Sequence, residues 1–478
     1  MSGRRQERGT HREQLRAGIA GLALLAVAGC RKPPPAELVY TGSAPALPGA
    51  PTAGAGAPTA AQPSAATPGG SAEAPGATPS LAGAAGAGSQ PAAAPAPMVN
   101  EAAQCTPPAA PSGPFSKAQL IAASADCAIW HYCTFESSAR ALESAARAYR
   151  DEPSAARQGA AQQAYGSAMA SWQRAELFRF GPAARSGEPG GQDLRDLIYA
   201  WPVRAECKVD EQTVSQSYGT PEFHGTDFAA SPVTGRTLSA LEYLLFNPST
   251  QNRCSAFAGI NASGGWAALT ATEVQERRRA YAAEAAADVT ARSRQLLSAW
   301  NEGFRSRFTE SGAGNPSFTS EQQVLNAVSN ALFYLDLELK DQKLATPLGL
   351  TPECTATSCP DAVESRFTAN SLSYLRENLI GFRRLFQGCG ADYAGVGFDD
   401  WLRDAGAGEL AERLIRDLGG VETALARVQG SLAQVLLQDR ASVLAVHTAV
   451  KAVTDELKTE FVTVLNLELP AATEGDND

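Results

Sequence analysis

The stretch ASVLAVHTAVKAVTDELKTEFVTV, residues 441–464, decides the class of fold. Its large apolar side chains recur every three or four residues, at Val443, Val446, Val450, Val453, Leu457, Phe461 and Val464. This spacing places them on one face of a helix and is typical of a helix that packs in a bundle. His447 lies on the polar flank of this face, where we expect it to be solvated.

The rest of the chain from Phe115 onward has the same helical character. Ala, Leu, Glu, Gln and Arg dominate, and no sustained alternation of β-branched and polar residues occurs, so we predict an all-α fold. The pattern predicts long helices over residues 116–150, 154–180, 270–308, 320–342, 365–386, 408–438 and 440–469. A Gly/Ser/Pro-rich break at residues 311–317 separates two sets, 113–310 and 311–470. We interpret them as two up-and-down four-helix bundles packed side by side.

The N-terminus has the pattern of a lipoprotein signal. Arginines are followed by a short run of small and apolar residues that ends in Val27-Ala28-Gly29-Cys30, a length that suits a signal peptide and is too short to span a bilayer. We predict that residues 1–29 are removed and that acyl chains on Cys30 hold the protein to a membrane. Arg31 replaces the aspartate that favours inner-membrane retention in enteric bacteria, which favours the outer membrane. The alternative is an ordinary cleaved signal with a chance cysteine.

Residues 30–112 are almost entirely Ala, Pro, Gly, Ser and Thr. They offer too few large apolar side chains to offset the entropy of ordering a backbone, so we expect a disordered tether. The folded part would then face the periplasm or the cell surface. The net charge of the whole chain is −10, which argues against a nucleic-acid partner and favours the attraction of cations.

Eight cysteines remain if Cys30 is acylated, and an even number in an exported protein points to disulfides. Cys354 and Cys359 flank a short loop, and Cys207 and Cys254 bracket a loop-rich region, so these are the local pairs that we favour. Zinc binding by thiolates is the alternative. It is disfavoured because no Cys-x-x-Cys pair occurs.

Residues 235–246, GRTLSALEYLLF, place one carboxylate inside an apolar helical turn. Leu238, Leu241 and Leu245 recur at helical spacing around Glu242. An unpaired charge beside such a packed face is costly, so Glu242 requires a partner. One explanation is a structural acid that pairs with an arginine such as Arg236, or that accepts hydrogen bonds from loop amides around Trp201.

This segment resembles the signature of the imelysin-like proteins, a bacterial envelope family whose motif reads Gly-x-His-x-x-Glu followed by an aromatic residue and two leucines. Glu242 matches the glutamate, whereas Ser239 stands at the histidine position and Thr237 at the glycine position. Other segments that resemble family landmarks are residues 170–182, 198–202, 343–349, 371–382 and 474–476. The resemblance implies two related four-helix bundles, with the signature near their junction.

The other explanation for Glu242 is a metal site. In the intact motif, histidine and glutamate three residues apart share one helical face and can bind one ion. Ser239 offers a neutral oxygen instead, which a hard cation tolerates better than zinc does. We therefore expect a divalent or ferric ion on Glu242, with Ser239 and Trp201 in the wall of the site. The supplementary ligands that we expect are Glu176, His224 and Asp227.

The family is named for a peptidase activity and is linked to iron acquisition, so the resemblance implies either a metallopeptidase or an iron-related binding protein. The replacement of the histidine weakens the first more than the second. No His-x-x-x-His pair, Gly-x-Ser-x-Gly elbow or phosphate-binding loop occurs. We predict a non-catalytic protein that binds a metal ion or a metal-bearing ligand at the bundle junction. The alternatives are a divergent metallopeptidase and a structural envelope lipoprotein with a vestigial site.

Overall fold

The structure of the protein is a computed structural model. It describes residues 105–109, 111, 113–203, 205–225 and 232–473. Every regular element in these ranges is a helix, which confirms the predicted all-α fold. None of the described helices combines the length and the apolar character needed to cross a bilayer. The predicted signal, the acylated Cys30, the tether as far as residue 104 and the expected ligand Asp227 lie outside the described residues.

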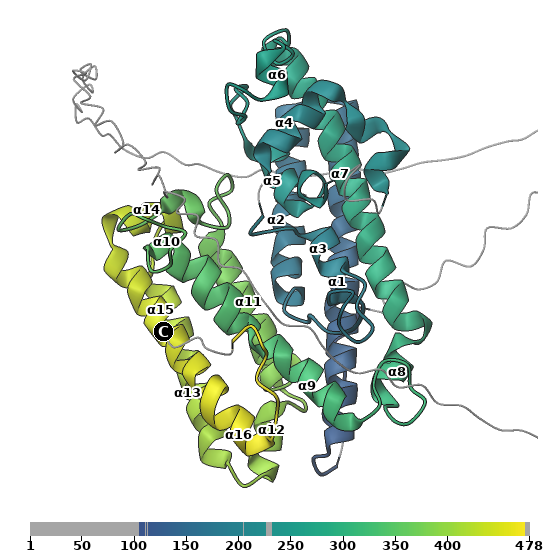
Figure 1. The fold of residues 1–478 in the computed structure, drawn as a ribbon, viewed down its shortest axis with the longest axis vertical. Coiled ribbons are helices and arrows are strands. Elements are labelled where there is room, and N and C mark those ends of the chain that lie inside the picture. Colours follow the sequence, from purple (N-terminus) through teal and green to yellow (C-terminus); the bar gives the residue numbers. More distant parts are fainter. Residues whose placement is uncertain (1–104, 110, 112, 204, 226–231, 474–478) are drawn as a thin grey trace, which may run out of the picture. The chain divides into compact units, whose positions relative to one another are not determined.

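The first bundle consists of three long helices and one short helix (Figure 1). The long ones are α1 (Lys117–Asp151), α2 (Ala155–Ala175) and α7 (Ala271–Ala299). The short one is α5 (Leu238–Phe246), which packs against both α2 and α7 and so closes the ring. The segment that contains Glu242 therefore takes the place of a fourth long helix.

The second bundle has four long members, drawn from green to yellow in Figure 1. They are α9 (Glu321–Leu332) with its π-helical continuation η7 (Leu335–Ala345), α11 (Ser371–Phe386), α13 (Gly408–Arg427) and α15 (Arg440–Glu456). η7 packs against α11 and α15, and α13 packs against the same two helices. The two bundles that the sequence predicted are thus both present in the described residues.

Shorter elements accompany these helices, and seven of those described lie between α2 and α7. They are η2 (Gly181–Ala183), α3 (Leu194–Ile198), α4 (Glu206–Ser215), η3 (Ser217–Gly219), η4 (Pro221–His224), η5 (Val233–Gly235), α6 (Gly259–Ala262), η6 (Trp300–Phe304), α8 (Arg305–Thr309), α10 (Thr346–Leu348), η8 (Pro360–Ala362), η9 (Ala391–Tyr393), α12 (Phe398–Asp404), α14 (Leu432–Gln438), η10 (Leu457–Phe461) and α16 (Val462–Leu465).

Several long helices begin where a side chain satisfies the first free backbone amides. The hydroxyls of Ser116, Ser154 and Ser320 each accept a hydrogen bond from the amide three residues later. Thr270 and Glu273 form a reciprocal capping box at the start of α7. These caps explain why the predicted starts agree closely with the observed ones.

The last helix departs from the predicted seam after Phe461. The buried residues Val443 to Phe461 follow the expected spacing, but η10 inserts a π-helical turn that adds a residue to the repeat. After Phe461 the buried residues are therefore Val462 and Leu465. Val464 is 41% exposed, so the prediction that it belongs to the packed face was wrong. The expectation that His447 is solvated was also wrong, since it is only 9% exposed.

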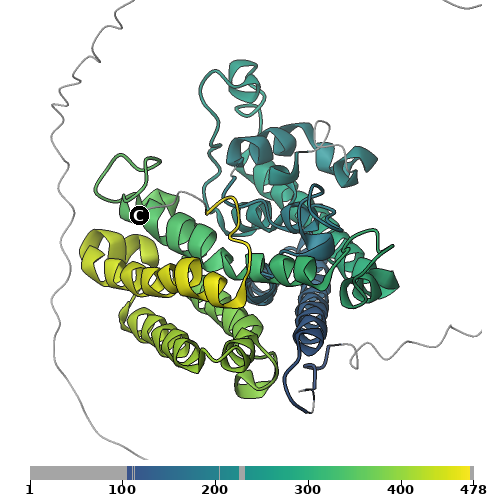
Figure 2. The same cartoon turned by 60° about the horizontal axis from the view of Figure 1, so that its bottom comes forward.

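The two bundles meet through α2 and α11 and lie side by side in both views (Figures 1 and 2). Gly381 on α11 faces the end of α2 so closely that a Cβ there would lie 2.5 Å from the backbone oxygen of Arg174. The Arg174 guanidinium also forms an ion pair with Glu377 across this contact. The absence of a side chain at Gly381 thus permits the close packing at the junction.

Four disulfides lie within the described residues. The two pairs that the sequence favoured, Cys207–Cys254 and Cys354–Cys359, are both formed. Cys105–Cys133 attaches the start of the described chain to α1, although Cys105 falls within the predicted tether. Cys127–Cys389 connects α1 to the segment after α11 and so joins the two bundles covalently.

Candidate functional site

Glu242 lies on α5 and is only 8% exposed. Its Oε1 accepts hydrogen bonds from Ser365 Oγ at 3.0 Å, from the Phe367 amide at 3.1 Å and from the Thr368 amide at 3.0 Å. Burial raises the pKa of Glu242, although these hydrogen bonds oppose the rise. The carboxylate of the first bundle is therefore held by a loop of the second bundle.

Neither structural partner that the sequence suggested for Glu242 is the observed one. The Arg236 guanidinium donates to the backbone oxygens of Phe223 and Gly225 and lies 3.6 Å from Asp288. The amides that donate to Glu242 belong to Phe367 and Thr368, not to the loop around Trp201. The prediction that Glu242 is a buried acid that accepts hydrogen bonds from loop amides was therefore correct, but the loop that donates them is a different one.

A network of buried polar side chains lies between α2 and the second bundle, with Lys343 at its centre. Lys343 Nζ is 2.8 Å from Glu176 Oε1 and 3.0 Å from Glu364 Oε1. It also donates to Gln173 Oε1 at 2.7 Å and to Asn378 Oδ1 at 2.8 Å. All five side chains are at most 4% exposed, so one ammonium group neutralises carboxylates from both bundles away from water.

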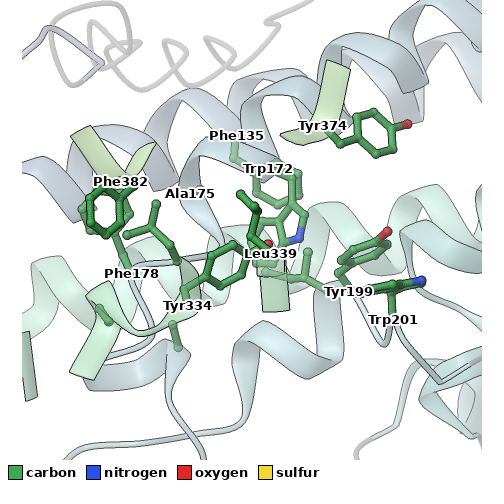
Figure 3. Close-up of a cluster of buried hydrophobic side chains, with 14 of the residues drawn as sticks. Phe135, Trp172, Ala175, Phe178, Tyr199, Trp201, Tyr334, Leu339, Tyr374 and Phe382 are labelled. Carbon is green, nitrogen blue, oxygen red and sulfur yellow. The ribbon is translucent and has the colours of Figure 1, made fainter. Parts of the chain in front are cut away.

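Aromatic hydroxyls and one arginine complete this network. Tyr334 donates to Glu176, whose other oxygen lies 3.5 Å from Arg195. Tyr199 donates to Glu364 at 2.8 Å. Figure 3 shows Tyr199, Trp201 and Tyr334 among the apolar side chains of the surrounding core. The Lys343 ammonium group thus lies against two aromatic rings, those of Trp201 and Tyr334.

The two carboxylates of the network differ in their pKa. Burial acts to raise the pKa of Glu176, but Lys343 and Arg195 outweigh it and leave that pKa below its usual value. Burial raises the pKa of Glu364, and the nearby Glu176 adds to the rise against the effect of Lys343. One ammonium between two acids thus separates their proton affinities.

A small cavity of about 30 Å³ adjoins this network. Glu242, Ser239, Trp201 and Glu364 all line it, so the structure brings together three residues that the sequence placed in one site. Within the described chain, Ser239 Oγ and Glu364 Oε2 are buried without a hydrogen-bond partner. A space of this size holds about two water molecules or one ion.

The other predicted ligands lie elsewhere. Glu176 belongs to the buried network and does not line the small cavity. The His224 ring lies 3.4 Å from Asp288 and 3.5 Å from Glu284, both on α7, and its hydrogen bond to Asp288 raises its pKa. Asp227 lies outside the described residues. The predicted set of four ligands is therefore not assembled around one point by the described residues.

The donors around Glu242 suit only a hard cation, and poorly. They are carboxylate and hydroxyl oxygens, and Glu364 already pairs with Lys343. Two other groups have metal-like spacing, Cys127, His131 and Cys389, and Cys207, Glu211 and Cys254. In each group the two cysteines form a disulfide, so neither offers a thiolate.

A much larger cleft of about 1100 Å³ opens between the bundles on the other side of Trp201. The first bundle contributes Arg179, Phe180, Arg195 and Trp201 to its walls, and the second contributes Tyr334, Glu338, Gln342 and His447. Trp201 lines both the cleft and the small cavity, and its ring lies 5.5 Å from Lys343 Nζ. Among the described residues, Trp201 thus lines both spaces and also contacts the ammonium group at the centre of the network.

Sequence reasoning missed Lys343, Glu364 and the cleft residue Glu338 as parts of the site. Lys343 had a signal, because it begins one of the landmark segments, residues 343–349. Glu364 lies in a loop just before Ser365 and carries no pattern of its own. Glu338 lies on η7, and the predicted α-helix over residues 320–342 gave no indication of a π-helical turn there.

Comparison with known proteins agrees with this architecture. The family model for Peptidase M75, imelysin, matches residues 128–459. Iron-regulated protein A of Synechococcus elongatus is 24% identical over 338 residues, which are 69% of this chain and 82% of that protein.

Two solved structures share the fold. An imelysin-like protein from Psychrobacter arcticum superposes with a TM-score of 0.54 at 15% identity, over 74% of this chain and 96% of that one. A putative iron-regulated protein A precursor from Parabacteroides distasonis superposes with a TM-score of 0.55 at 15% identity, over 75% of this chain and 97% of that one.

Proposed function

Because this chain belongs to the imelysin family, we propose that it binds a metal-bearing organic ligand in the cleft between its two bundles, without transforming that ligand. The observation that carries the proposal is the cleft itself. It has a volume of about 1100 Å³ and is lined by both bundles, and a cleft of that size suits an organic ligand better than a bare ion.

Two further points support this choice. The carboxylates that a bare ion would need are occupied, since Glu176 and Glu364 bind Lys343, and Glu242 binds the loop at residues 365–368. The relative in Synechococcus elongatus carries the name iron-regulated protein A. We therefore propose iron as the metal, brought by the ligand rather than held by protein side chains alone.

A second candidate function is the binding of a bare hard cation in the small cavity. It is favoured by two oxygens there, Ser239 Oγ and Glu364 Oε2, which have no partner among the described residues. Glu242 would supply a further carboxylate. Replacing Ser239 by histidine should raise the affinity of such a site for transition metals, because an imidazole is a stronger ligand for them than a hydroxyl.

One pair of variants separates the two candidates. Ala327 lies half-buried in the wall of the cleft and not of the small cavity, so Ala327→Trp should fill part of the cleft. We expect this change to weaken binding of a ferric trihydroxamate by at least tenfold, measured by calorimetry, and Glu242→Gln to leave it nearly unchanged. Melting temperatures serve as the control for folding.

The bare-ion candidate predicts the reverse for manganese or calcium ions. Their binding should be lost in Glu242→Gln and kept in Ala327→Trp. If the unaltered protein binds neither ferric citrate nor a ferric trihydroxamate, the proposed function is wrong. If Ala327→Trp binds both as tightly as the unaltered protein does, the ligand does not occupy the cleft.

For the location we propose the cell envelope, with acyl chains on Cys30 as the anchor. The support is the Val-Ala-Gly-Cys sequence at residues 27–30 together with four disulfides, which are typical of an oxidising compartment. We expect Cys30→Ser to move the protein from the membrane fraction to the soluble fraction. Equal membrane retention of the variant would contradict an anchor at Cys30.

A further inference from the structure

The two walls of the large cleft carry opposite charge. The charged residues that the first bundle contributes are Arg179, Arg185, Glu188, Arg195 and Asp196. Those of the second bundle are Glu338, Asp341, Glu353 and Lys451, with His447 beside them. With histidine neutral, cations outnumber acids on the first wall, and acids outnumber cations on the second. By the formal charge of the lining side chains, the first wall is thus net positive and the second net negative.

The buried polar atoms of the cleft residues show the same asymmetry. Within the described residues, four such atoms have no hydrogen-bond partner. The two on the first wall, Arg195 Nε and Trp201 Nε1, are donors. The two on the second wall, Glu338 Oε2 and Gln342 Oε1, are acceptors. The unpartnered buried atoms of the first wall are therefore donors, and those of the second wall are acceptors.

Among the described lining residues, one ion pair joins the two walls, between Arg179 after α2 and Glu338 on η7. The Arg179 side chain is 26% exposed, whereas that of Glu338 is 9% exposed. Burial and the neighbouring Arg195 guanidinium lower the pKa of Arg179 to about 10. Positive charge is thus crowded on the first wall, although Glu338 lies opposite.

We propose that the cleft binds an organic ligand with separated charges, its anionic group against the first wall and its cationic group against the second. The ligand carboxylate would replace Glu338 at Arg179, and the ligand ammonium would replace Arg179 at Glu338. A ligand with only one charge would leave either the buried Glu338 or the half-buried Arg179 without a partner, and the cost is larger for the buried group. The inference rests on the proposed function in that it places the ligand in the cleft, but it does not require that the ligand carry a metal.

The aromatic side chains accommodate the rest of such a ligand. Phe180, Trp201 and Tyr334 are each at most 3% exposed and lie in the cleft walls. Their faces and edges provide apolar contact between the two charged regions. The expected ligand is therefore an organic molecule with an apolar middle section and oppositely charged ends.

A charge series on one chelate tests this inference. The probe is a linear ferric trihydroxamate with a free amine at one end and a free carboxylate at the other. The comparison forms are its N-acetyl derivative, its methyl ester and the doubly blocked form. Calorimetric titration should show the doubly charged form binding at least tenfold more tightly than each of the other three.

Two variants show which wall binds the carboxylate end of the probe and which wall binds the amine end. Arg179→Gln should abolish the preference for the free carboxylate over the ester, and Glu338→Gln the preference for the free amine over the N-acetyl form. Arg174→Gln is the matched control, because it also loses an ion pair between the bundles, with Glu377, and neither residue lines the cleft. It should retain both preferences. A loss of folding alone would weaken all four probe forms equally.

The inference is wrong if the four forms bind equally, if a singly charged form binds most tightly, or if none binds. In the last case, binding of ferric citrate in the cleft would still leave the proposed function standing. If the metal-free doubly charged form binds as tightly as its ferric complex, the inference holds and the metal-bearing ligand of the proposed function is wrong.

Discussion

Replacing Lys343 by methionine is expected to lower the free energy of unfolding by about 3–5 kcal/mol, which is the usual cost of removing one partner from a buried ion pair. Lys343 is 2% exposed and bonds to Glu176 and Glu364, which are 1% and 4% exposed. Methionine is unbranched and only one atom shorter than lysine, but it leaves Glu364 without the Lys343 ammonium group. Denaturant unfolding with the disulfides intact measures the effect.

The matched control is Lys208→Met. Lys208 pairs with Glu211 at 3.3 Å, but both side chains are more than a third exposed. Water screens this pair, so its loss should cost less than about 1 kcal/mol. A similar cost for both variants would contradict a special role for the buried network.

The pH dependence of the Lys343→Met variant provides a second readout. Burial already raises the pKa of Glu364 in the unaltered protein, and removing Lys343 removes the main effect that opposes the rise. A carboxyl whose folded pKa lies above its unfolded value destabilises the folded state when it is charged. The loss of unfolding free energy in Lys343→Met should therefore become smaller as the pH falls from 7 toward about 4.3, the pKa of a glutamate in the unfolded chain. A deficit that is the same at pH 7 and pH 5 would contradict this.

The sequence predicted which segments form the site better than it predicted what their side chains do there. Glu176, Trp201, Lys343 and Asn378 all lie in segments that resemble family landmarks, and the structure places them in or against one buried network. Spacing along the chain cannot show that Glu176 faces an ammonium group rather than a metal ion. That pairing arises only when α2 packs against the second bundle.

The fold was largely predictable because its determinants are local. Caps at Ser116, Ser154 and Ser320 mark helix starts, and apolar periodicity marks the bundle faces. The π-helical turns were not predictable, since they add a residue without any change in composition. They account for the exposed Val464, and η7 is the π-helical segment that carries Glu338 and Gln342 of the cleft wall.

The cleft is a property of the junction rather than of any segment. Its walls come from residues 179–202 in the first bundle and mainly from residues 327–353 and 447–451 in the second. The charge difference between the walls exists only if the bundles keep their relative position. A covalent connection between them therefore matters for binding as well as for stability.

Replacing both Cys127 and Cys389 by alanine should remove that connection and lower the free energy of unfolding by about 2–5 kcal/mol. The two cysteines are 262 residues apart, and theirs is the only disulfide of the described residues that joins the bundles. The chain-entropy estimate is about 5.6 kcal/mol for this separation and about 2 kcal/mol for Cys354 and Cys359, which are 5 residues apart. The double alanine variant at Cys354 and Cys359 is therefore the control.

Thermal unfolding without reductant should rank the two double variants in that order. Because α2 and α11 still pack at Gly381 and the Lys343 network still connects the bundles, the Cys127 and Cys389 variant should fold at moderate temperature with its helix content intact. It should bind a ferric trihydroxamate more weakly than the control does, since the cleft walls are then less firmly fixed. Equal melting temperatures and equal binding in the two variants would show that noncovalent packing alone fixes the junction.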